Sequence, residues 1–403
     1  MTTTLSIPPN DTDSGLVSIS PLNSTDVYVN TSTDTSWTGT STPGGQKGPH
    51  FTEFTEYKVA EFINNYYLYL VCGIGVPGNV ACIVTLTCMK PKLSSALFMM
   101  TLAFADLIAI ALKLLYLLLT QNDVRMGDRV CQLVFMFGTA SQMYSNWILV
   151  AMTMERFIAI WFPFQVKKLC TKRNAMAVLV ILLVFFILAN LQFLFTFEEI
   201  NDSFMSWDCR PKEKYREFIQ FVWYWIDGAL YAIIPIVVIM ILNSLIIYAV
   251  RKSSNAHLHL TNRVQNLNEK MSQQKQITMM LLTTSLVFLL LIMPNCVFFI
   301  AREYWTWKET ALGIAQYYLV YQIVFLLSDL NHAVNFYLYC FSGRKFRQKF
   351  IELICCRRKR SRSSPSSYVS SMGVPRLGIS SSAATHTCTA RPSPVRCLQN
   401  NHI

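Results

Sequence analysis

The sequence predicts an all-α membrane protein, a seven-transmembrane helix bundle followed by a short amphipathic eighth helix. Of the 403 residues, 52% are hydrophobic and only 14% are charged, whereas about 25% of the residues of a soluble domain are charged. The apolar residues form seven runs of about 20 or more, the length that a helix needs to cross a hydrocarbon core about 30 Å thick. Glu155 and Arg156 close the third run and mark a boundary between hydrocarbon and water.

The seven predicted helices follow one another along the chain. They span residues 66–89, 95–119, 131–161, 174–197, 218–250, 276–301 and 311–341. Asp329, Asn331, His332 and Asn335 interrupt the last run, and polar residues within a span usually face the interior of a bundle. We therefore expect a seventh helix with one polar face.

The segments outside the bundle have a different composition. Residues 1–60 are rich in Thr, Ser, Pro, Gly and Asp, and they begin without a signal-peptide pattern, so we expect a disordered extracellular tail. The bundle should occupy 61–342, an amphipathic juxtamembrane helix 343–356 and a disordered cytoplasmic tail 357–403. Four N-x-S/T sites on one predicted side indicate glycosylation there: Asn10, Asn23, Asn30 and Asn201.

The basic residues predict the orientation. Lys and Arg gather in alternate loops, for example at Lys167, Lys168 and Arg251, and in the tail after Gly343. The positive-inside rule places these segments in the cytoplasm. We therefore expect a multi-pass plasma-membrane protein with an extracellular N-terminus. The net charge of +12 follows from this orientation, and no nucleic-acid partner need be invoked.

The cysteines divide between the two sides. Cys131 and Cys209 are the two that clearly fall on the outer, oxidising side, so a disulfide, if one forms, joins them. Cys355 and Cys356 follow the basic amphipathic segment 344–350. Palmitoylation at these two positions is the favoured interpretation, because it would anchor a juxtamembrane helix to membrane lipid.

Several short motifs stand in a fixed order along the predicted helices. They are Gly78-Asn79, the Leu102 to Asp106 motif, Cys131, Glu155-Arg156-Phe157, Pro235, Phe288 with Pro294, and Asn335-Phe336-Tyr337-Leu338-Tyr339. Each motif alone is weak, but their order and spacing together are specific. Over about residues 66–356 the chain resembles the rhodopsin-like (class A) family of G-protein-coupled receptors. The ending of the seventh helix and Asn243 resemble neuropeptide receptors of the invertebrate type.

Three positions depart from the family pattern. Phe336 replaces the proline of the seventh-helix motif, Ile292 replaces the tryptophan of the sixth helix, and Asn243 replaces a tyrosine of the fifth. These differences concern the switch between the quiet and active states, and not the fold.

The resemblance implies a switch at the inner ends of the helices. Glu155 and Arg156 can form an ion pair that holds these ends together while the receptor is quiet. A charge pair that only fixes the depth of the third helix is the alternative. The further switch and G-protein-coupling residues that the resemblance implies are Phe157, Phe288, Asn335 and Tyr339.

Asp106 is an acid in the middle of the second span, where an isolated carboxylate is costly. The resemblance places Ser145, Asn331 and Asn335 around it as a sodium site, and oxygen-bearing side chains suit a hard cation. A hydrogen-bonded network without an ion is the alternative. For His332 we expect a packing or hydrogen-bonding role.

The resemblance places the ligand in the outer half. Gly138 stands where amine receptors carry an aspartate, and the seventh helix lacks the lysine of an opsin. Lys113 and Asp329 are charged within spans, and mutual pairing is the cheapest explanation for keeping both. The pair is either a static packing element or a target for a charged group of the ligand. The residues expected to bind the ligand are Lys113, Gln142, Asp227, Asn295, Phe299, Tyr321, Phe325 and Asp329.

Aromatic residues gather near the outer boundary. For Trp223, Tyr224, Trp225 and Trp305 an interfacial belt is favoured over peptide contacts.

The function that the resemblance implies is reception of an extracellular ligand, a neuropeptide, and nucleotide exchange on a heterotrimeric G protein. The loop 252–272 should contribute to the G-protein contact, and the Ser-rich tail after Arg360 suits an arrestin and a receptor kinase. Neither a His-x-x-x-His nor a Gly-x-Ser-x-Gly motif is present, so we expect no enzyme. A seven-helix structural or adhesion protein without G-protein coupling is the alternative.

Overall fold

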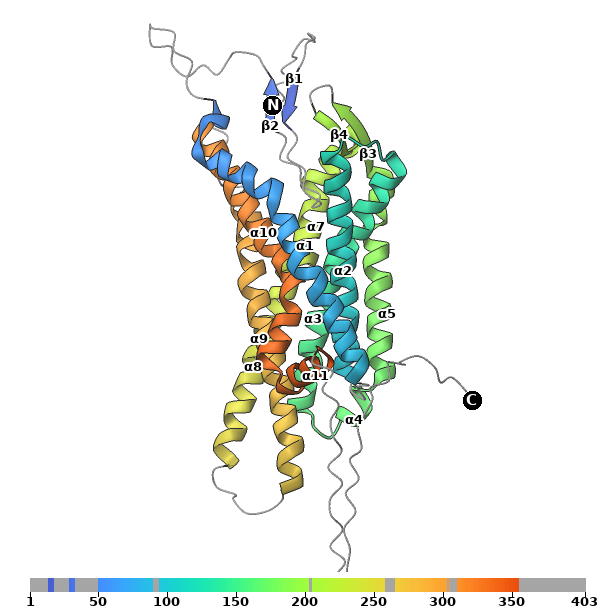
Figure 1. Cartoon of the computed structure of the whole chain (residues 1–403), viewed down its shortest axis with the longest axis vertical. Coiled ribbons are helices and arrows are strands. Elements are labelled where there is room, and N and C mark those ends of the chain that lie inside the picture. Colours follow the sequence, from blue (N-terminus) through green and yellow to red (C-terminus); the bar gives the residue numbers. More distant parts are fainter. Residues whose placement is uncertain are drawn as a thin grey trace, which may run out of the picture. The chain divides into compact units, whose positions relative to one another are not determined.

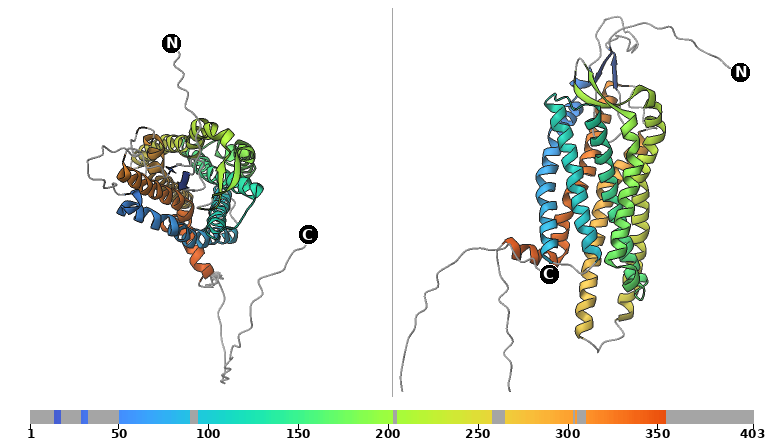
Figure 2. Two further views of the ribbon diagram at one scale, coloured as in Figure 1. Left: turned by 90° about the horizontal axis from the view of Figure 1, so that it is seen from above. Right: turned by 90° about the vertical axis from the view of Figure 1, so that its right-hand side faces the viewer.

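The computed structural model describes residues 14–17, 29–32, 50–89, 94–202, 205–257, 265–302, 304 and 310–354. All of them belong to one compact unit, Met1–Arg357. Long helices run side by side in it (Figure 1) and enclose a common interior when seen from above (Figure 2).

Each predicted span contains a long helix. The long helices are α1 (Thr55–Met89), α2 (Ser94–Gln121), α3 (Asp128–Trp161), α5 (Lys172–Ala189), α8 (Ile234–His257), α9 (Gln265–Ala301) and α10 (Ala311–Ser342). Of these, α5 ends earlier and α8 begins later than predicted, because shorter helical pieces make up the rest of the fourth and fifth spans. Shorter helices are η1 (Phe51–Glu53), α4 (Val166–Leu169), η2 (Asn190–Gln192), α6 (Phe193–Thr196), η3 (Glu213–Tyr215), α7 (Tyr224–Gly228) and α11 (Arg344–Ile354).

Among the described residues, six stretches are long and apolar enough to cross a membrane. They are Thr55–Met89, Ser94–Gln121, Lys172–Thr196, Glu213–Lys252, Thr278–Ala301 and Ala311–Ser342. The remaining long helix of the predicted seven, α3, carries buried polar side chains such as Gln142, Ser145 and Asn146. It packs against α2, α5, α8 and α9. Its polar residues therefore face neighbouring helices, as expected for an interior helix.

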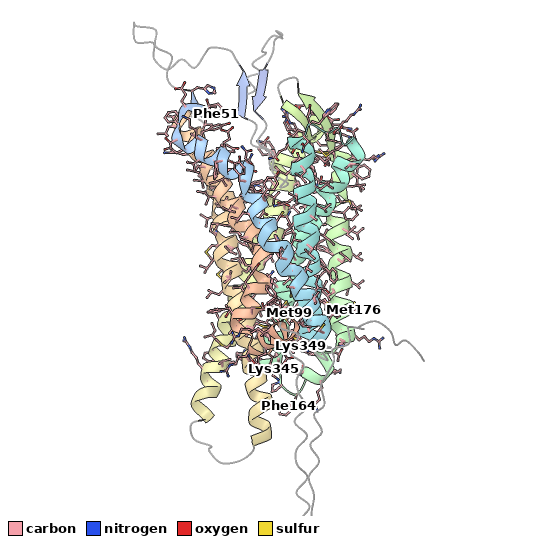
Figure 3. All side chains as sticks on the ribbon, viewed as in Figure 1. Phe51, Met99, Phe164, Met176, Lys345 and Lys349 are labelled. Atoms are coloured by element: carbon pink, nitrogen blue, oxygen red, sulfur yellow. A yellow bond between two sulfur atoms is a disulfide. The ribbon has the colours of Figure 1, made fainter. Side chains whose placement is uncertain are left out.

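The first helix begins earlier than predicted. The sequence suggested a tail up to residue 60, but α1 begins at Thr55 and η1 precedes it. Phe51 is buried, and its ring lies 5.4 Å from that of Tyr57, which in turn lies 5.3 Å from that of Tyr318 on α10. These aromatic contacts hold the entry to α1 against α10. Phe51 lies at the end of the bundle opposite to Phe164 (Figure 3).

The fifth span contains two π-helical turns, η4 (Phe218–Trp223) and η5 (Ala229–Ile233), before α8. Pro235 has no N–H to donate to the carbonyl four residues earlier, that of Tyr231. This carbonyl accepts a hydrogen bond from Nδ2 of Asn146 on α3 at 2.9 Å. The carbonyl of Leu230 likewise accepts from Nε1 of Trp147 at 2.8 Å. The irregular backbone thus binds α3 to the fifth span.

Two short antiparallel hairpins complete the fold. β1 (Ser14–Val17) pairs with β2 (Val29–Ser32), and β3 (Phe197–Asp202) pairs with β4 (Met205–Pro211). The sequence reasoning did not foresee either hairpin. Cys209 in β4 forms a disulfide with Cys131 of α3, with 5.8 Å between their Cα atoms. The β3–β4 hairpin is therefore fixed to the outer end of α3.

Candidate functional site

The loop between α2 and α3 is clamped onto the β3–β4 hairpin. The Glu199 carboxylate accepts hydrogen bonds from the backbone N–H groups of Met126, at 2.5 Å, and Gly127, at 2.8 Å. The hydroxyl of Tyr116 on α2 donates to Asp208, which also pairs with Arg210 at 3.2 Å. Together with the disulfide, these contacts hold the outer loops in place. The disulfide predicted between Cys131 and Cys209 is confirmed.

An aromatic cluster fills the outer ends of α7, α9 and α10. Tyr224 stacks on Phe299 at 4.9 Å between ring centroids and donates a hydrogen bond to the Phe299 carbonyl at 2.6 Å. Tyr321 packs against Phe325 at 4.4 Å and against Phe298 at 5.9 Å. Three predicted ligand residues, Phe299, Tyr321 and Phe325, thus belong to one cluster.

The prediction of an interfacial belt was wrong for two of the aromatic residues. Trp223 and Tyr224 are buried, and Trp223 packs on Phe193 of α6. Trp225, in contrast, is 45% exposed. The π-helical turn η4 ends at Trp223 and directly precedes Tyr224, so a count that assumes a regular α-helix places their faces incorrectly. Trp305 lies outside the described residues.

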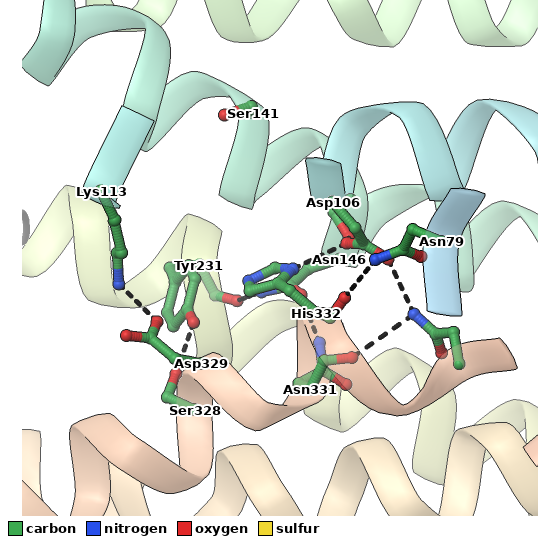
Figure 4. A network of polar contacts seen from close by, with 12 residues as sticks. Asn79, Asp106, Lys113, Ser141, Asn146, Tyr231, Ser328, Asp329, Asn331 and His332 are labelled. Atoms are coloured by element: carbon green, nitrogen blue, oxygen red, sulfur yellow. Dashed lines mark hydrogen bonds and ion pairs between the residues drawn. The ribbon is translucent and has the colours of Figure 1, made fainter. Parts of the chain in front are cut away.

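Lys113 and Asp329 form the predicted ion pair in the interior of the bundle (Figure 4). Both side chains are buried. A narrow gap beside the pair is lined by Gln142 of α3 and by His332, one turn further along α10. Neither polar atom of the Gln142 side chain has a hydrogen-bond partner among the described residues. The pair and the gap therefore form a polar floor beneath the outer half of the bundle.

Two further residues predicted to bind the ligand do not line this gap. Asp227 on α7 and Asn295 on α9 are buried, and no partner for Oδ1 of Asp227 or for the amide of Asn295 lies in the described part of the chain. All eight residues predicted to bind the ligand are buried. A ligand can reach them only when the helices around them separate.

Asp106 is fully buried and accepts three hydrogen bonds. Oγ of Ser145 lies 2.5 Å and Nδ1 of His332 lies 2.8 Å from Oδ1, and Nδ2 of Asn335 lies 2.9 Å from Oδ2. Ser145 and Asn335 are thus where the sequence predicted, and His332 has the hydrogen-bonding role expected of it. The amide of Asn331 donates to Oδ1 of Asn146 at 3.2 Å, and no hydrogen bond from Asn331 to Asp106 is found among the described residues.

The Glu155–Arg156 pair lies at the inner end of α3. The two side chains are buried and lie 3.4 Å apart, from Nη2 of Arg156 to Oε2 of Glu155. Glu155 accepts a hydrogen bond from the hydroxyl of Ser94, and Arg156 donates to the hydroxyl of Ser95. Both serines open α2. The pair therefore ties α3 to the inner end of α2.

Cys170, between α4 and α5, lies against this pair. Its carbonyl accepts from the Ser94 hydroxyl at 3.2 Å. Burial, and to a smaller extent the charge of Glu155, raises the pKa of the Cys170 thiol, and Arg156 opposes this shift. The cysteine is thus held as a neutral packing group.

The other predicted switch residues are spread over the inner half. Phe288 and Tyr339 are fully buried, and Asn335 belongs to the Asp106 network. Phe157 is half-buried, with its ring 5.8 Å from that of Trp161. Phe336, in the place of the family proline, packs on Phe350 of α11 at 4.8 Å.

Two of the four predicted glycosylation sites lie in strands. Asn30 lies in β2 and Asn201 in β3. Asn10, Asn23, Cys355 and Cys356 lie outside the described residues.

Comparison with known proteins settles the family. The model of the "7 transmembrane receptor (rhodopsin family)" matches residues 78–339, more than half of the chain. This chain belongs to the rhodopsin family of seven-transmembrane receptors. Its multi-pass membrane topology agrees with the six apolar stretches and with α3.

Several curated receptors are similar to this one over most of its length. A probable G-protein coupled receptor of Caenorhabditis elegans is 23% identical over 72% of this chain and 69% of the relative. The FMRFamide receptor of Drosophila melanogaster is 24% identical over 75% of this chain and 57% of the relative. The human growth hormone secretagogue receptor type 1 is 27% identical over 70% of this chain and 77% of the relative.

Sequence reasoning missed several residues of the receptor's polar sites. Ser94, Ser95, Tyr116 and Asp208 were not singled out, because each acts through a contact with another element of the chain. Polar residues at the start of a predicted helix were the available signal for the two serines. His332 was noticed as an intramembrane histidine, but its partner Asp106 was not predicted.

Proposed function

We propose that this receptor lies in the plasma membrane with its N-terminus outside, binds an extracellular peptide and catalyses nucleotide exchange on a heterotrimeric G protein. The observation that carries the proposal is the buried Glu155–Arg156 pair, closed by Ser94 and Ser95 of α2. A buried ion pair of one helix whose hydrogen-bond partners include serines of a second helix can exist in two arrangements, which a switch requires.

The outer half supports a peptide as the ligand. The aromatic cluster around Tyr224, Phe299 and Tyr321 offers large apolar surfaces with hydroxyl groups, which suit a peptide side chain. The Lys113–Asp329 pair lies deeper and can exchange partners with a charged group of the ligand. One relative is named as an FMRFamide receptor, which agrees with a peptide.

The inner half supports a G-protein contact. A narrow gap between α3, α8 and α9 is lined by Thr153, Arg156, Asn243 and Ser285. Oγ of Thr153 and Oγ of Ser285 are 3.3 Å apart. Phe164, beside α4 on the same side, is 98% exposed (Figure 3). An exposed aromatic ring on the same side of the bundle as the buried Arg156 suits a protein partner that binds when the helix ends separate.

Further partners belong to the same proposal. The basic helix α11, with Lys345 and Lys349, suits the anionic inner membrane surface. A receptor kinase would phosphorylate the Ser-rich tail after Arg360, and an arrestin would bind it. Palmitoylation of Cys355 and Cys356 would anchor the segment to membrane lipid. We propose no enzymatic reaction of the receptor itself.

The experiment that tests the function is ligand-dependent nucleotide exchange. Cells that express the receptor are screened with a synthetic peptide library, and the active peptide is added to purified receptor in membranes with a G protein. We expect peptide-dependent release of GDP. Peptide binding without exchange on any G-protein class would favour the structural or adhesion alternative.

A further inference from the structure

Three side chains in the described part of the chain lie within hydrogen-bonding distance of the Asp106 carboxylate. The hydroxyl of Ser145 and the amide nitrogen of Asn335 donate to it at 2.5 and 2.9 Å. The third group is Nδ1 of His332, at 2.8 Å (Figure 4). In the tautomer with its hydrogen on Nδ1, the imidazole of His332 donates to Oδ1 as the third group around this carboxylate.

A sodium ion does not fit this arrangement. A hard cation binds through the lone pairs of oxygen atoms. The carboxylate offers about four lone-pair sites, and three of them accept the hydrogen bonds above. The three other oxygen-bearing residues that the family resemblance implied are all engaged: Ser145 donates its hydroxyl to Oδ1, Asn335 turns its nitrogen toward Asp106, and Asn331 donates to Asn146.

We propose that His332 takes the place of the cation at Asp106, so that this receptor does not bind sodium there. The imidazole is 2% exposed, and its Nδ1 lies 2.8 Å from Oδ1, where it occupies space beside the carboxylate. The proposal concerns the bundle alone. It therefore stands or falls independently of G-protein coupling.

The same imidazole connects Asp106 with the floor of the outer half. Its second nitrogen, Nε2, has no hydrogen-bond partner in the part of the chain that is described. His332 also lines the gap next to Lys113, Gln142 and Asp329. A ligand that disturbs the Lys113–Asp329 pair would thus reach Asp106 through a single side chain, that of His332.

Thermal unfolding of the purified receptor tests the proposal without a known ligand. Melting temperatures are compared in NaCl and in KCl, each at about 150 mM, a physiological ionic strength. An ion that binds only the folded state raises the melting temperature by mass action. We expect equal melting temperatures in the two salts. A sodium-selective rise of several degrees in the unaltered receptor would overturn the proposal.

Two variants test the role of His332 itself. His332→Ser removes the N–H from Oδ1 and supplies a hydroxyl oxygen, so we expect it to gain a sodium-selective rise in melting temperature. Adding Asp106→Asn to this variant should abolish the gain, because the amide lacks the charge. His332→Ala repeats the comparison if the serine variant does not fold. A folded variant without any sodium dependence would show that His332 is not the group that closes the site.

Discussion

The ammonium group of Lys113 on α2 is paired with the carboxylate of Asp329 on α10 inside the helix bundle. Two helices adjacent in the bundle are thereby joined at a depth where a lone charge costs about 2.5–3.5 kcal/mol. The contact agrees with the pairing predicted from the two charges and from the family arrangement, in which these helices are neighbours.

Exchanging the two charges tests whether the pair is more than a packing element. The double variant Lys113→Asp with Asp329→Lys should restore the surface expression lost by either single change, because the pair can form again. If the ligand uses the pair, agonist potency should remain at least tenfold lower, equivalent to about 1.4 kcal/mol. Dose–response curves on cells measure this. Unaltered potency would show that the pair is structural only.

Ser94 should restrain the switch. Replacement by alanine removes the hydroxyl that donates to Glu155 and weakens the tie between α2 and α3. We expect Ser94→Ala to raise ligand-independent nucleotide exchange several-fold at equal expression. Ser141→Ala is the matched control, since that buried hydroxyl donates only to carbonyls of its own helix, those of Phe137 and Gly138. Equal basal exchange in the two variants would refute this role of Ser94.

Gly75 allows α1 to pack closely on its neighbours. A Cβ atom there would lie 2.6 Å from Cδ1 of Ile110 and 3.1 Å from Cβ of Ala333. Gly75→Ala should therefore cost about 1–3 kcal/mol through overpacking, seen as a lower melting temperature. Gly73→Ala, which meets nothing within 4 Å, should be neutral. Adding Ile110→Val to Gly75→Ala removes the clashing methyl group and should recover stability; no recovery would contradict this cause.

The tail after Arg360 should regulate the receptor. Its serines, which include Ser363, Ser364, Ser366 and Ser367, could each gain a charge of about −1.5 to −2 on phosphorylation. Truncation after Arg360 should slow internalisation and desensitisation after agonist addition, measured by surface labelling. Internalisation at the full-length rate would mean that the tail is a solvated linker.

The positions of the long helices, one ion pair and the disulfide could be predicted from the composition and the order of the residues. Apolar runs located the long helices, and two charges in neighbouring spans were enough for the Lys113–Asp329 pair. The disulfide between Cys131 and Cys209 followed from the side on which each cysteine falls. These predictions need only the depth of a residue in the membrane, which hydropathy gives.

Contacts that depend on the rotation of a helix about its axis were harder to predict from the sequence. Asn331 and His332 are consecutive, and the sequence alone could not show which of them faces Asp106. The π-helical turns of the fifth span shift the faces of Trp223 and Tyr224, and periodicity assumes a regular helix. The aromatic contact of Tyr57 with Tyr318 extends α1 beyond its apolar run, which hydropathy cannot detect.

Arg156→Ala tests the central claim most directly. The matched control is Arg173→Ala, because Arg173 is exposed at the start of α5 on the same side of the bundle. Agonist-dependent nucleotide exchange is measured on purified receptor with a G protein, alongside binding of the same labelled agonist. We predict that Arg156→Ala abolishes exchange and retains agonist binding, whereas Arg173→Ala keeps both. Exchange at the unaltered rate in Arg156→Ala would contradict the account.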